Sequence, residues 1–251
     1  MRPSLGGNRR RDPTMDTVQA ISLVLGASWA AGINLYAAVL VLGLLNATGH
    51  VVLPADLQVL SDPLVLLGAG ALYAIEFFAD KTPGVDTGWD ALHTFIRIPA
   101  GALLALGAAD AITVDEASRF TATLIEGSAL LGGGALAATS HATKAGTRVL
   151  INTSPEPFSN WLAAFTEDFA VVAGLWTAPN NPVLFLGLLV LFLLLVAWLL
   201  PRIYVGIRRV ARAIGRWLGR RDGEPSQDVP QGRRERLKQA LSRDAEDQGK
   251  V

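Results

Sequence analysis

The chain has 251 residues, of which 51% are hydrophobic, and its mean hydropathy is +0.36. Long apolar runs carry this surplus, which exceeds what one soluble core absorbs and predicts a membrane protein. The formal net charge is zero, and the absence of Cys excludes disulfide bonds and thiolate metal sites.

Residues 1–16 carry four Arg residues, and we expect a basic cytoplasmic segment that fixes topology rather than a cleaved signal peptide. Met15 is an alternative start. About six apolar spans follow, most of them long enough for a bilayer core of about 30 Å. The spans are predicted at residues 17–47, 63–80, 88–109, 118–151, 155–178 and 182–200.

Two of these spans, residues 17–47 and 118–151, are too long for a single crossing, since each would extend roughly 46 Å as one helix. Both contain Gly near the middle, at Gly32 and at residues 132–134. They are either tilted helices that pack closely at Gly or discontinuous helices whose broken middles face a cavity. The sequence leaves both interpretations open.

The order of the spans predicts an internal repeat. Residues 17–110 form a first membrane repeat and residues 111–200 a second, each with one long span interrupted by Gly and two ordinary spans. Because three crossings reverse the direction of the chain, the two units are expected in opposite orientations. The predicted fold is therefore an all-α polytopic membrane helix bundle with a 3+3 inverted repeat.

The distribution of Lys and Arg predicts the orientation. The loops at 48–62 and 179–181 contain neither residue, and Arg119 is the only base in the segments assigned to the outside. This bias places both the N-terminus and the C-terminus in the cytoplasm of a protein of the cell inner (plasma) membrane.

The end of the chain differs in composition from the spans. Residues 201–221 contain seven Arg residues, which run from Arg202 to Arg221, and no acid. We predict a basic amphipathic juxtamembrane helix that binds anionic lipids, and lipid alone explains it without nucleic-acid binding. Residues 222–251 mix charges with Gly, Pro, Ser and Gln and are expected to be a disordered tail.

Ionisable residues gather in two stretches within apolar surroundings, residues 76–97 and 141–168. Charge inside a bilayer is costly, so such residues usually line a pathway or a site. At helical spacing they form stripes on four spans, which are placed to converge. The candidate substrate or ion pathway residues are Asn34, Glu76, Asp80, Asp90, His93, Arg97, His141, Lys144, Arg148 and Glu167.

Residues of these two stretches also have purely structural interpretations, among them ion pairs of Glu76 with Lys81 and of Glu167 with Arg148. Asp90 fits the acid of a capping box that starts at Thr87, and Lys81 and Arg97 fit side chains that snorkel to the membrane surface. For the set as a whole a functional role is favoured, because so many ionic groups exceed what helix packing needs.

Three chemistries fit the set. Acids with His suit proton or cation relay, whereas Arg and Lys suit an anion or a phosphate head group. A divalent metal is least favoured, because His93 and His141 lie in different spans without local ligand spacing. No nucleophile elbow or phosphate-binding loop is present, so no catalytic residue, cofactor or metal is predicted and an enzyme is not favoured.

Four motifs together resemble a known family. They are GINLY at 32–36, EFFADKTPGVD at 76–86, RIPAGA at 97–102, and residues 141–148 with SPEP at 154–157. They resemble an uncharacterised bacterial integral-membrane family that is catalogued only as a domain of unknown function. The resemblance covers about residues 18–180 and extends toward 200. It implies a membrane location and no established activity.

The sequence favours a transporter or channel for a small ion or polar solute, with a charged cavity on the cytoplasmic side. The alternatives left open are a membrane enzyme or flippase that acts on a lipid phosphate, and a non-catalytic membrane scaffold. The lipid bilayer is the expected partner, and the sequence does not fix the oligomeric state.

Overall fold

The computed structural model describes residues 15–112, 119–153, 157–219, 235–236 and 238–239. Its elements are α1 (Thr17–Ile33), α2 (Leu35–Ala47), the 3-10 helix η1 (Ala55–Ser61), α3 (Pro63–Ala79), α4 (Val85–Ala109), α5 (Arg119–Ile151), α6 (Pro157–Asn180) and α7 (Pro182–Gly219). Contacts divide the chain into a unit of residues 1–207 and a second unit of residues 208–251, and each is described by itself.

Among the described residues, three helices are long and apolar enough to cross a membrane: α4, α5 and the Pro182–Arg209 part of α7. A fourth crossing results if η1 and α3, which meet at a bend of 66°, form one span. The predicted all-α polytopic membrane bundle is therefore confirmed. The two first helices, α1 and α2, are apolar but shorter.

Side chains that cap the helices explain where they begin. Asp16 accepts a hydrogen bond from the Gln19 N–H at 2.7 Å, and the Gln19 side chain accepts one from the Asp16 N–H at 3.0 Å, which is a capping box. Asp62 accepts from the Leu64 N–H at 2.8 Å, with Pro63 in the first turn.

The long first span is two helices that meet at Asn34. Asn34 has extended backbone angles (φ −146°, ψ 98°), which end α1, and its side chain accepts a hydrogen bond from the Ala37 N–H at 2.9 Å, which begins α2. The 17 residues of α1 and the 13 of α2 span about 25 Å and about 20 Å. Neither alone reaches across a hydrocarbon core of about 30 Å.

Contacts with α6 trace the path of α1. At its start, the Gln19 side chain donates a hydrogen bond to the Pro179 carbonyl at 3.2 Å, near the end of α6. At its end, Asn34 Nδ2 donates to Asp168 Oδ1 at 3.0 Å. These two positions on α6 are separated by a rise of about 16 Å, so α1 runs from the end of α6 to its middle.

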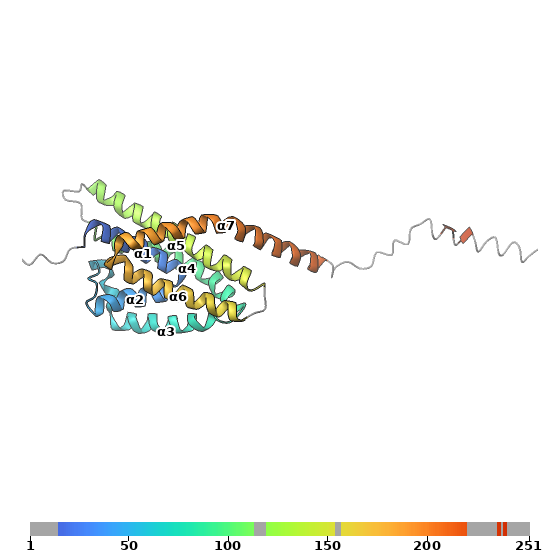
Figure 1. Ribbon diagram of the computed structural model, residues 1–251, viewed down its shortest axis with the longest axis horizontal. Helices are drawn as coiled ribbons and strands as arrows, with labels where there is room; N and C mark the ends of the chain where they lie inside the picture. Colours follow the sequence, from blue (N-terminus) through green and yellow to red (C-terminus); the bar gives the residue numbers. More distant parts are fainter. Residues whose placement is uncertain (1–14, 113–118, 154–156, 220–234, 237, 240–251) are drawn as a thin grey trace, which may run out of the picture. The chain divides into compact units, whose positions relative to one another are not determined.

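The chain then returns along α2. The His50 ring, which follows α2, lies 5.5 Å from the Trp176 ring near the end of α6. α1 and α2 therefore form a re-entrant hairpin, which enters and leaves the bundle at one end. In Figure 1 the two helices occupy one end of the bundle, whereas α3, α5 and α6 run along its length.

We name the two ends of the first unit by what they hold. The hairpin end holds the start of α1, residues 48–62, the end of α4, and the turn between α6 and α7. The network end holds the turn 80–84, the end of α5 and the start of α6. α7 reaches the network end, because Ile203 packs against Gly146 in the last third of α5.

This arrangement differs from the predicted topology. Residues 17–47 do not cross as one span, because Asn34 turns the chain back. The start of α1 and Ile203 consequently lie at opposite ends of the first unit. This arrangement does not support the prediction that the N-terminus and the C-terminus both lie in the cytoplasm. The inverted repeat is not confirmed either, since α1 and α5 both start at the hairpin end and run in the same direction.

The Gly-rich segment of α5 is not a helix break. α5 is continuous from Arg119 to Ile151, and an added Cβ at Gly133 would lie 2.8 Å from Ser28 Oγ and 3.3 Å from the Gly101 carbonyl. Here the close-packing interpretation is correct, and only the first long span is discontinuous.

Small residues allow α1 to pack closely between α4 and α5. Ser28 Oγ donates to the carbonyls of Val24 at 2.8 Å and Gly101 at 3.3 Å, and Ser140 Oγ donates to the Trp29 carbonyl at 3.0 Å. Such hydrogen bonds and close backbone approaches replace the hydrophobic effect between helices in lipid.

The remaining predicted segments are described only in part. The juxtamembrane helix expected at 201–221 is the continuation of α7 up to Gly219. Residues 1–14 of the basic N-terminal segment, and most of the tail at 222–251, lie outside the described residues.

Candidate functional site

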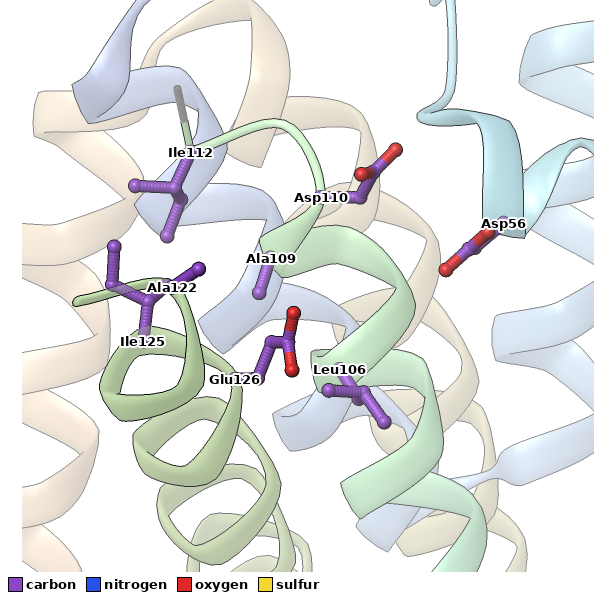
Figure 2. A pocket seen from close by; sticks show the side chains of 8 residues that line it. All are labelled: Asp56, Leu106, Ala109, Asp110, Ile112, Ala122, Ile125 and Glu126. Atoms are coloured by element: carbon purple, nitrogen blue, oxygen red, sulfur yellow. The ribbon is translucent and has the colours of Figure 1, made fainter. Parts of the chain in front are cut away.

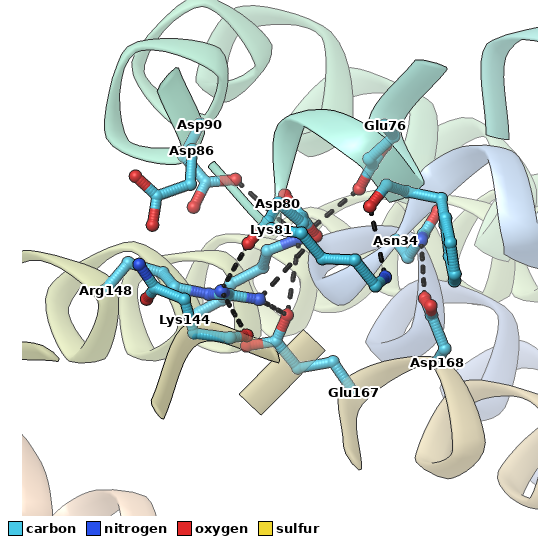
Figure 3. A network of polar contacts seen from close by, with 12 residues as sticks. Asn34, Glu76, Asp80, Lys81, Asp86, Asp90, Lys144, Arg148, Glu167 and Asp168 are labelled. Atoms are coloured by element: carbon cyan, nitrogen blue, oxygen red, sulfur yellow. Dashed lines mark hydrogen bonds and ion pairs between the residues drawn. The ribbon is translucent and has the colours of Figure 1, made fainter. Parts of the chain in front are cut away.

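Four elements bring seven ionic side chains into one cluster near the network end, most of which Figure 3 labels. We call it the ionic network. Its members are Glu76, Asp80, Asp90, Arg97, Lys144, Arg148 and Glu167. Six of these side chains are at most 4% exposed and the seventh, Glu167, is 17% exposed. The network is thus buried inside the protein and away from lipid.

Arg97 on α4 holds one half of the network. Its guanidinium donates to Glu76 Oε1 at 2.6 Å and to Asp90 Oδ1 at 2.8 Å, and contacts His141 Nδ1 at 3.2 Å. Asp90 lies beyond the first turn of α4, so the capping-box interpretation is wrong and Asp90 is an ion-pair partner. Arg97 is fully buried and does not snorkel.

Arg148 on α5 holds the other half. It donates to the carbonyls of Asp80 at 2.8 Å and Asn160 at 3.1 Å, and to Glu167 Oε2 at 2.8 Å. These bonds fix the α3–α4 turn and the first turns of α6 against α5.

Lys144, one turn before Arg148 on α5, joins the two halves. Its Nζ lies 2.7 Å from Asp80 Oδ2 and 3.3 Å from Glu76 Oε1. It also lies 3.5 Å from Glu167 Oε2 and 3.8 Å from Asp90 Oδ1. One ammonium therefore touches all four carboxylates of the network.

His141 is a neutral member of the site. The Arg97 N–H donates to His141 Nδ1, so Nδ1 carries a lone pair. Thr94 Oγ1 donates to the Asp90 carbonyl at 3.0 Å and hence accepts from His141 Nε2 at 2.8 Å. The proton sits on Nε2 by this geometry, and protonation of Nδ1 would oppose Arg97.

The re-entrant hairpin reaches the site through two contacts. The Asn34 amide binds Asp168 next to Glu167, and the Tyr36 hydroxyl lies 3.0 Å from His93 Nε2. His93 Nδ1 donates to the Trp89 carbonyl at 2.8 Å, which leaves Nε2 facing the Tyr36 hydroxyl. His93 and Asn34 thus line the hairpin tip and are not members of the ionic network itself.

A second buried polar cluster closes the network end. Asp86, which is fully buried, accepts from Asn152 Nδ2 at 2.7 and 3.0 Å and from the N–H groups of Gly84 and Thr87. Asn160 Nδ2 donates to Asn152 Oδ1 at 2.7 Å. The Asn152 side chain is thereby committed to internal contacts, although its sequence context matches a glycosylation sequon.

Lys81 lies in the turn after α3 and faces aromatic rings. Its Nζ lies 3.0 Å from the centre of the Phe77 ring and 4.5 Å from that of Phe165, and donates to the Phe77 carbonyl at 3.1 Å. The side chain is only 8% exposed, so the snorkelling interpretation does not hold for Lys81. It covers the space between α3 and α6 beside the network.

The network contains more acid than base. Its four carboxylates oppose the three cations of Arg97, Lys144 and Arg148, so full ionisation leaves one negative charge in excess. Among the described residues, five buried atoms of the network have no hydrogen-bond partner: Glu76 Oε2, Asp80 Oδ1, Asp90 Oδ2, Arg97 Nε and Arg148 Nε. Three are acceptors and two are donors, a combination that internal water can bridge.

The hairpin end carries a separate acidic cavity of about 390 Å³ (Figure 2). Asp56, Asp110 and Glu126 line it from η1, from the residue after α4, and from α5. Within the described part of the chain none of these three carboxylates has an ion-pair partner. The cavity is distinct from the ionic network.

The sequence identified most of the residues that the structure brings together. Eight of the ten predicted residues meet in the network or, for His141, touch it, and the other two lie at the hairpin tip. The list of candidate residues did not include Tyr36, Thr94, Asp86, Asn152 and Asp168, although the last three lie in the two ionisable stretches at 76–97 and 141–168. Asp168 was detectable as the neighbour of Glu167, whereas the bond between Tyr36 and His93 depends on the hairpin.

Comparison with protein families matches residues 21–202 to the family described as Domain of unknown function (DUF4126). The chain belongs to this family. The match covers the whole ionic network and all of the re-entrant hairpin except its first four residues, and it agrees with a motif resemblance that begins near residue 18 and extends toward residue 200. No curated protein and no solved structure matches the chain. The family brings no activity, so function is argued from the geometry.

Proposed function

We propose that this membrane protein moves a small cation, a proton or a monovalent ion, across the bilayer through the ionic network. The observation that carries the proposal is the excess of carboxylate over base in a buried cluster. An excess negative charge inside a protein is unfavourable unless a cation neutralises it. The unpartnered oxygens of three of these acids supply acceptors for that cation.

The hairpin supports the same proposal. A break in a membrane helix is tolerated where it lines a site or a cavity, and the break at Asn34 lies beside Asp168 and the network. The acidic cavity at the hairpin end would raise the local concentration of cations there, because clefts lined by one sign of charge attract counter-ions.

A lipid-phosphate enzyme or flippase receives less support. Recognition of a phosphate needs cations that are free to bind it. Arg97, Lys144 and Arg148 each already contact carboxylates at 2.6–2.8 Å. A scaffold would not require a buried excess charge, and the ion-pair partners are all internal.

We infer that the network end faces the cytoplasm of the inner membrane. The Arg-rich residues 202–221 follow directly where α7 reaches this end, and Lys and Arg gather on the cytoplasmic side of membrane proteins. The same residues would bind anionic lipids. The start of α1 then faces the opposite side.

The proposal is tested by ion flux in proteoliposomes. We expect wild-type protein to carry K⁺ or H⁺ down a gradient, and Glu76→Gln to lower the flux about tenfold or more, since a charged hydrogen bond is worth roughly 1.5–3 kcal/mol. Glu235→Gln, at an exposed acid of the second unit, is the matched control and should retain the flux. Wild-type flux equal to that of empty vesicles contradicts the proposal.

A further inference from the structure

Lys144 occupies a position that suits a mobile ion. Its ammonium lies 2.7, 3.3, 3.5 and 3.8 Å from oxygens of Asp80, Glu76, Glu167 and Asp90. An ammonium has three N–H groups, so it cannot donate to all four carboxylates at once. The four acids come from α3, the turn after it, α4 and α6, and the ammonium fills the centre between them.

The attachment of Lys144 differs from that of the two arginines. Arg148 donates to two backbone carbonyls, and Arg97 forms short bonds to two acids at once. The polar contacts of Lys144, within the residues that the structure describes, all go to carboxylates. Its flexible four-carbon stem holds a single point charge, so it can leave the centre without breaking a backbone contact.

The acids around Lys144 also have unused acceptors. Glu76 Oε2, Asp80 Oδ1 and Asp90 Oδ2 are buried without a hydrogen-bond partner, and each belongs to an acid that contacts Lys144. The residues Glu76, Asp80 and Asp90 are themselves at most 3% exposed. None of these three oxygens is hydrogen-bonded to the Lys144 ammonium, so each is available to turn toward a solute cation that takes the central position.

We call the four carboxylates around the Lys144 ammonium the cage. The distances from the ammonium nitrogen to their oxygens indicate which kind of cation fits. Mg²⁺ binds oxygen at about 2.0–2.1 Å and Ca²⁺ at about 2.3–2.6 Å, both shorter than the 2.7–3.8 Å around Nζ. The cage instead suits a monovalent cation of ammonium size.

We propose that the Lys144 ammonium occupies a cation-binding site, the four-carboxylate cage. A monovalent solute cation of ammonium size, K⁺ or a small primary ammonium, binds to this cage by displacing the Lys144 ammonium. This inference rests on the proposed cation transport and names its substrate class. Lys144 lies seven residues before the end of α5, about 10 Å from the network end.

Chemical rescue tests whether the cage accepts a solute cation. Lys144→Ala protein in detergent is heated in KCl, methylammonium chloride, NaCl or choline chloride at equal ionic strength. We expect K⁺ or methylammonium to raise the Tm by about 4 °C over choline when it saturates the cage. The matched control, Lys81→Ala, removes a neighbouring buried lysine and should show no such difference. Equal Tm values in all four salts overturn the proposal.

A labelling experiment on the wild-type chain applies even where Lys144→Ala fails to fold. Displacement exposes the Lys144 amine, so K⁺ or methylammonium should raise its rate of acylation severalfold over choline, measured by mass spectrometry. Lys238, exposed in the second unit, is the internal reference. A Lys144 rate that is the same in every salt overturns the proposal.

The two proposals fail in different ways. Ion flux without rescue and without salt-dependent labelling keeps cation transport and overturns the displacement of Lys144. Rescue and labelling without flux keep the cation site and overturn transport. A response to methylammonium alone, without K⁺, assigns the site to an organic ammonium rather than an alkali ion.

Discussion

Substituting Gly32 by Ala perturbs the point where the re-entrant hairpin touches α5. An added Cβ would overlap Ser140 Oγ and the Ala137 carbonyl, and would lie 2.9 Å from Ala137 Cα. The carbonyl belongs to the middle of a 33-residue helix and has no freedom to move aside. Ser140 is held as well, because its hydroxyl bonds to the Trp29 carbonyl at 3.0 Å.

The magnitude follows from three contributions. Overpacking costs about 1–3 kcal/mol, and loss of the Ser140 hydrogen bond about 1 kcal/mol. The better helix propensity of Ala offsets about 1 kcal/mol. The net loss of about 1–3 kcal/mol lowers the Tm by about 2–12 °C for a chain of this size.

The assay is thermal unfolding in detergent at one fixed scan rate, followed by Trp fluorescence. Gly132→Ala is the matched control, since it lies in α5 where an added Cβ meets nothing within 4 Å. It should leave the Tm unchanged or raise it slightly. A Tm of Gly32→Ala equal to that of Gly132→Ala would refute the packing of the hairpin against α5.

Three further expectations concern topology and the site. Single Cys residues at Asp16 and Thr48 should react with an impermeant thiol reagent from the same side of the membrane, and a Cys at Thr82 from the other side, because α1 and α2 return to one end. Arg97→Met should destabilise the protein by about 3–5 kcal/mol, since it leaves Glu76 and Asp90 without their nearest cation. Asn34→Ala should lower stability by about 1–3 kcal/mol through loss of the α2 cap and of the bond to Asp168.

Each of these has its own control. Labelling of Asp16→Cys and Thr48→Cys from opposite sides would show that residues 17–47 cross the membrane. Arg119→Met is the control for Arg97→Met, because Arg119 is exposed and its loss should have little effect on the Tm. If Arg97→Met lowers the Tm no more than Arg119→Met does, the burial of the network is contradicted. Asn180→Ala, which removes an exposed Asn at the end of α6, is the control for Asn34→Ala. If the two variants have equal stability, the role of Asn34 is contradicted.

The existence of the ionic network was predictable from the sequence. Glu76, Arg97 and Lys144 stand in runs that are otherwise apolar, and the high free energy of charge in lipid directs such residues inward. Helical periodicity then places Asp90 and Arg97 on one face of α4, where the structure finds them bonded at 2.8 Å. The pairing partners across helices required the packing and were not predictable.

The position of the helix break was predictable only in part. Gly32 and Gly133 look equivalent in sequence, and at both positions an added Cβ would collide with a neighbouring helix, with the Ala137 backbone at Gly32 and with the side chains of Ala105 and Ser28 at Gly133. The break falls at Asn34, whose side chain both caps α2 and binds Asp168. An Asn with these two partners replaces backbone hydrogen bonds that a Gly alone leaves open.

The return of the chain after Asn34 was not predictable from hydropathy. One long tilted helix and a hairpin of two half-length helices bury the same apolar residues and have the same composition. Contacts far apart in sequence decide between them, such as the 5.5 Å approach of the His50 and Trp176 rings. The topology and the inverted repeat inferred from counted crossings are not confirmed for this reason.

The most direct test of cation movement through the network is an electrical one. Proteoliposomes adsorbed on a solid-supported membrane are exposed to a rapid jump in K⁺ concentration or in pH, and the transient current is recorded. We expect a current from wild-type protein that Glu76→Gln abolishes and Glu235→Gln retains. A current no larger than that of protein-free vesicles, or one unchanged by Glu76→Gln, would contradict transport through the ionic network.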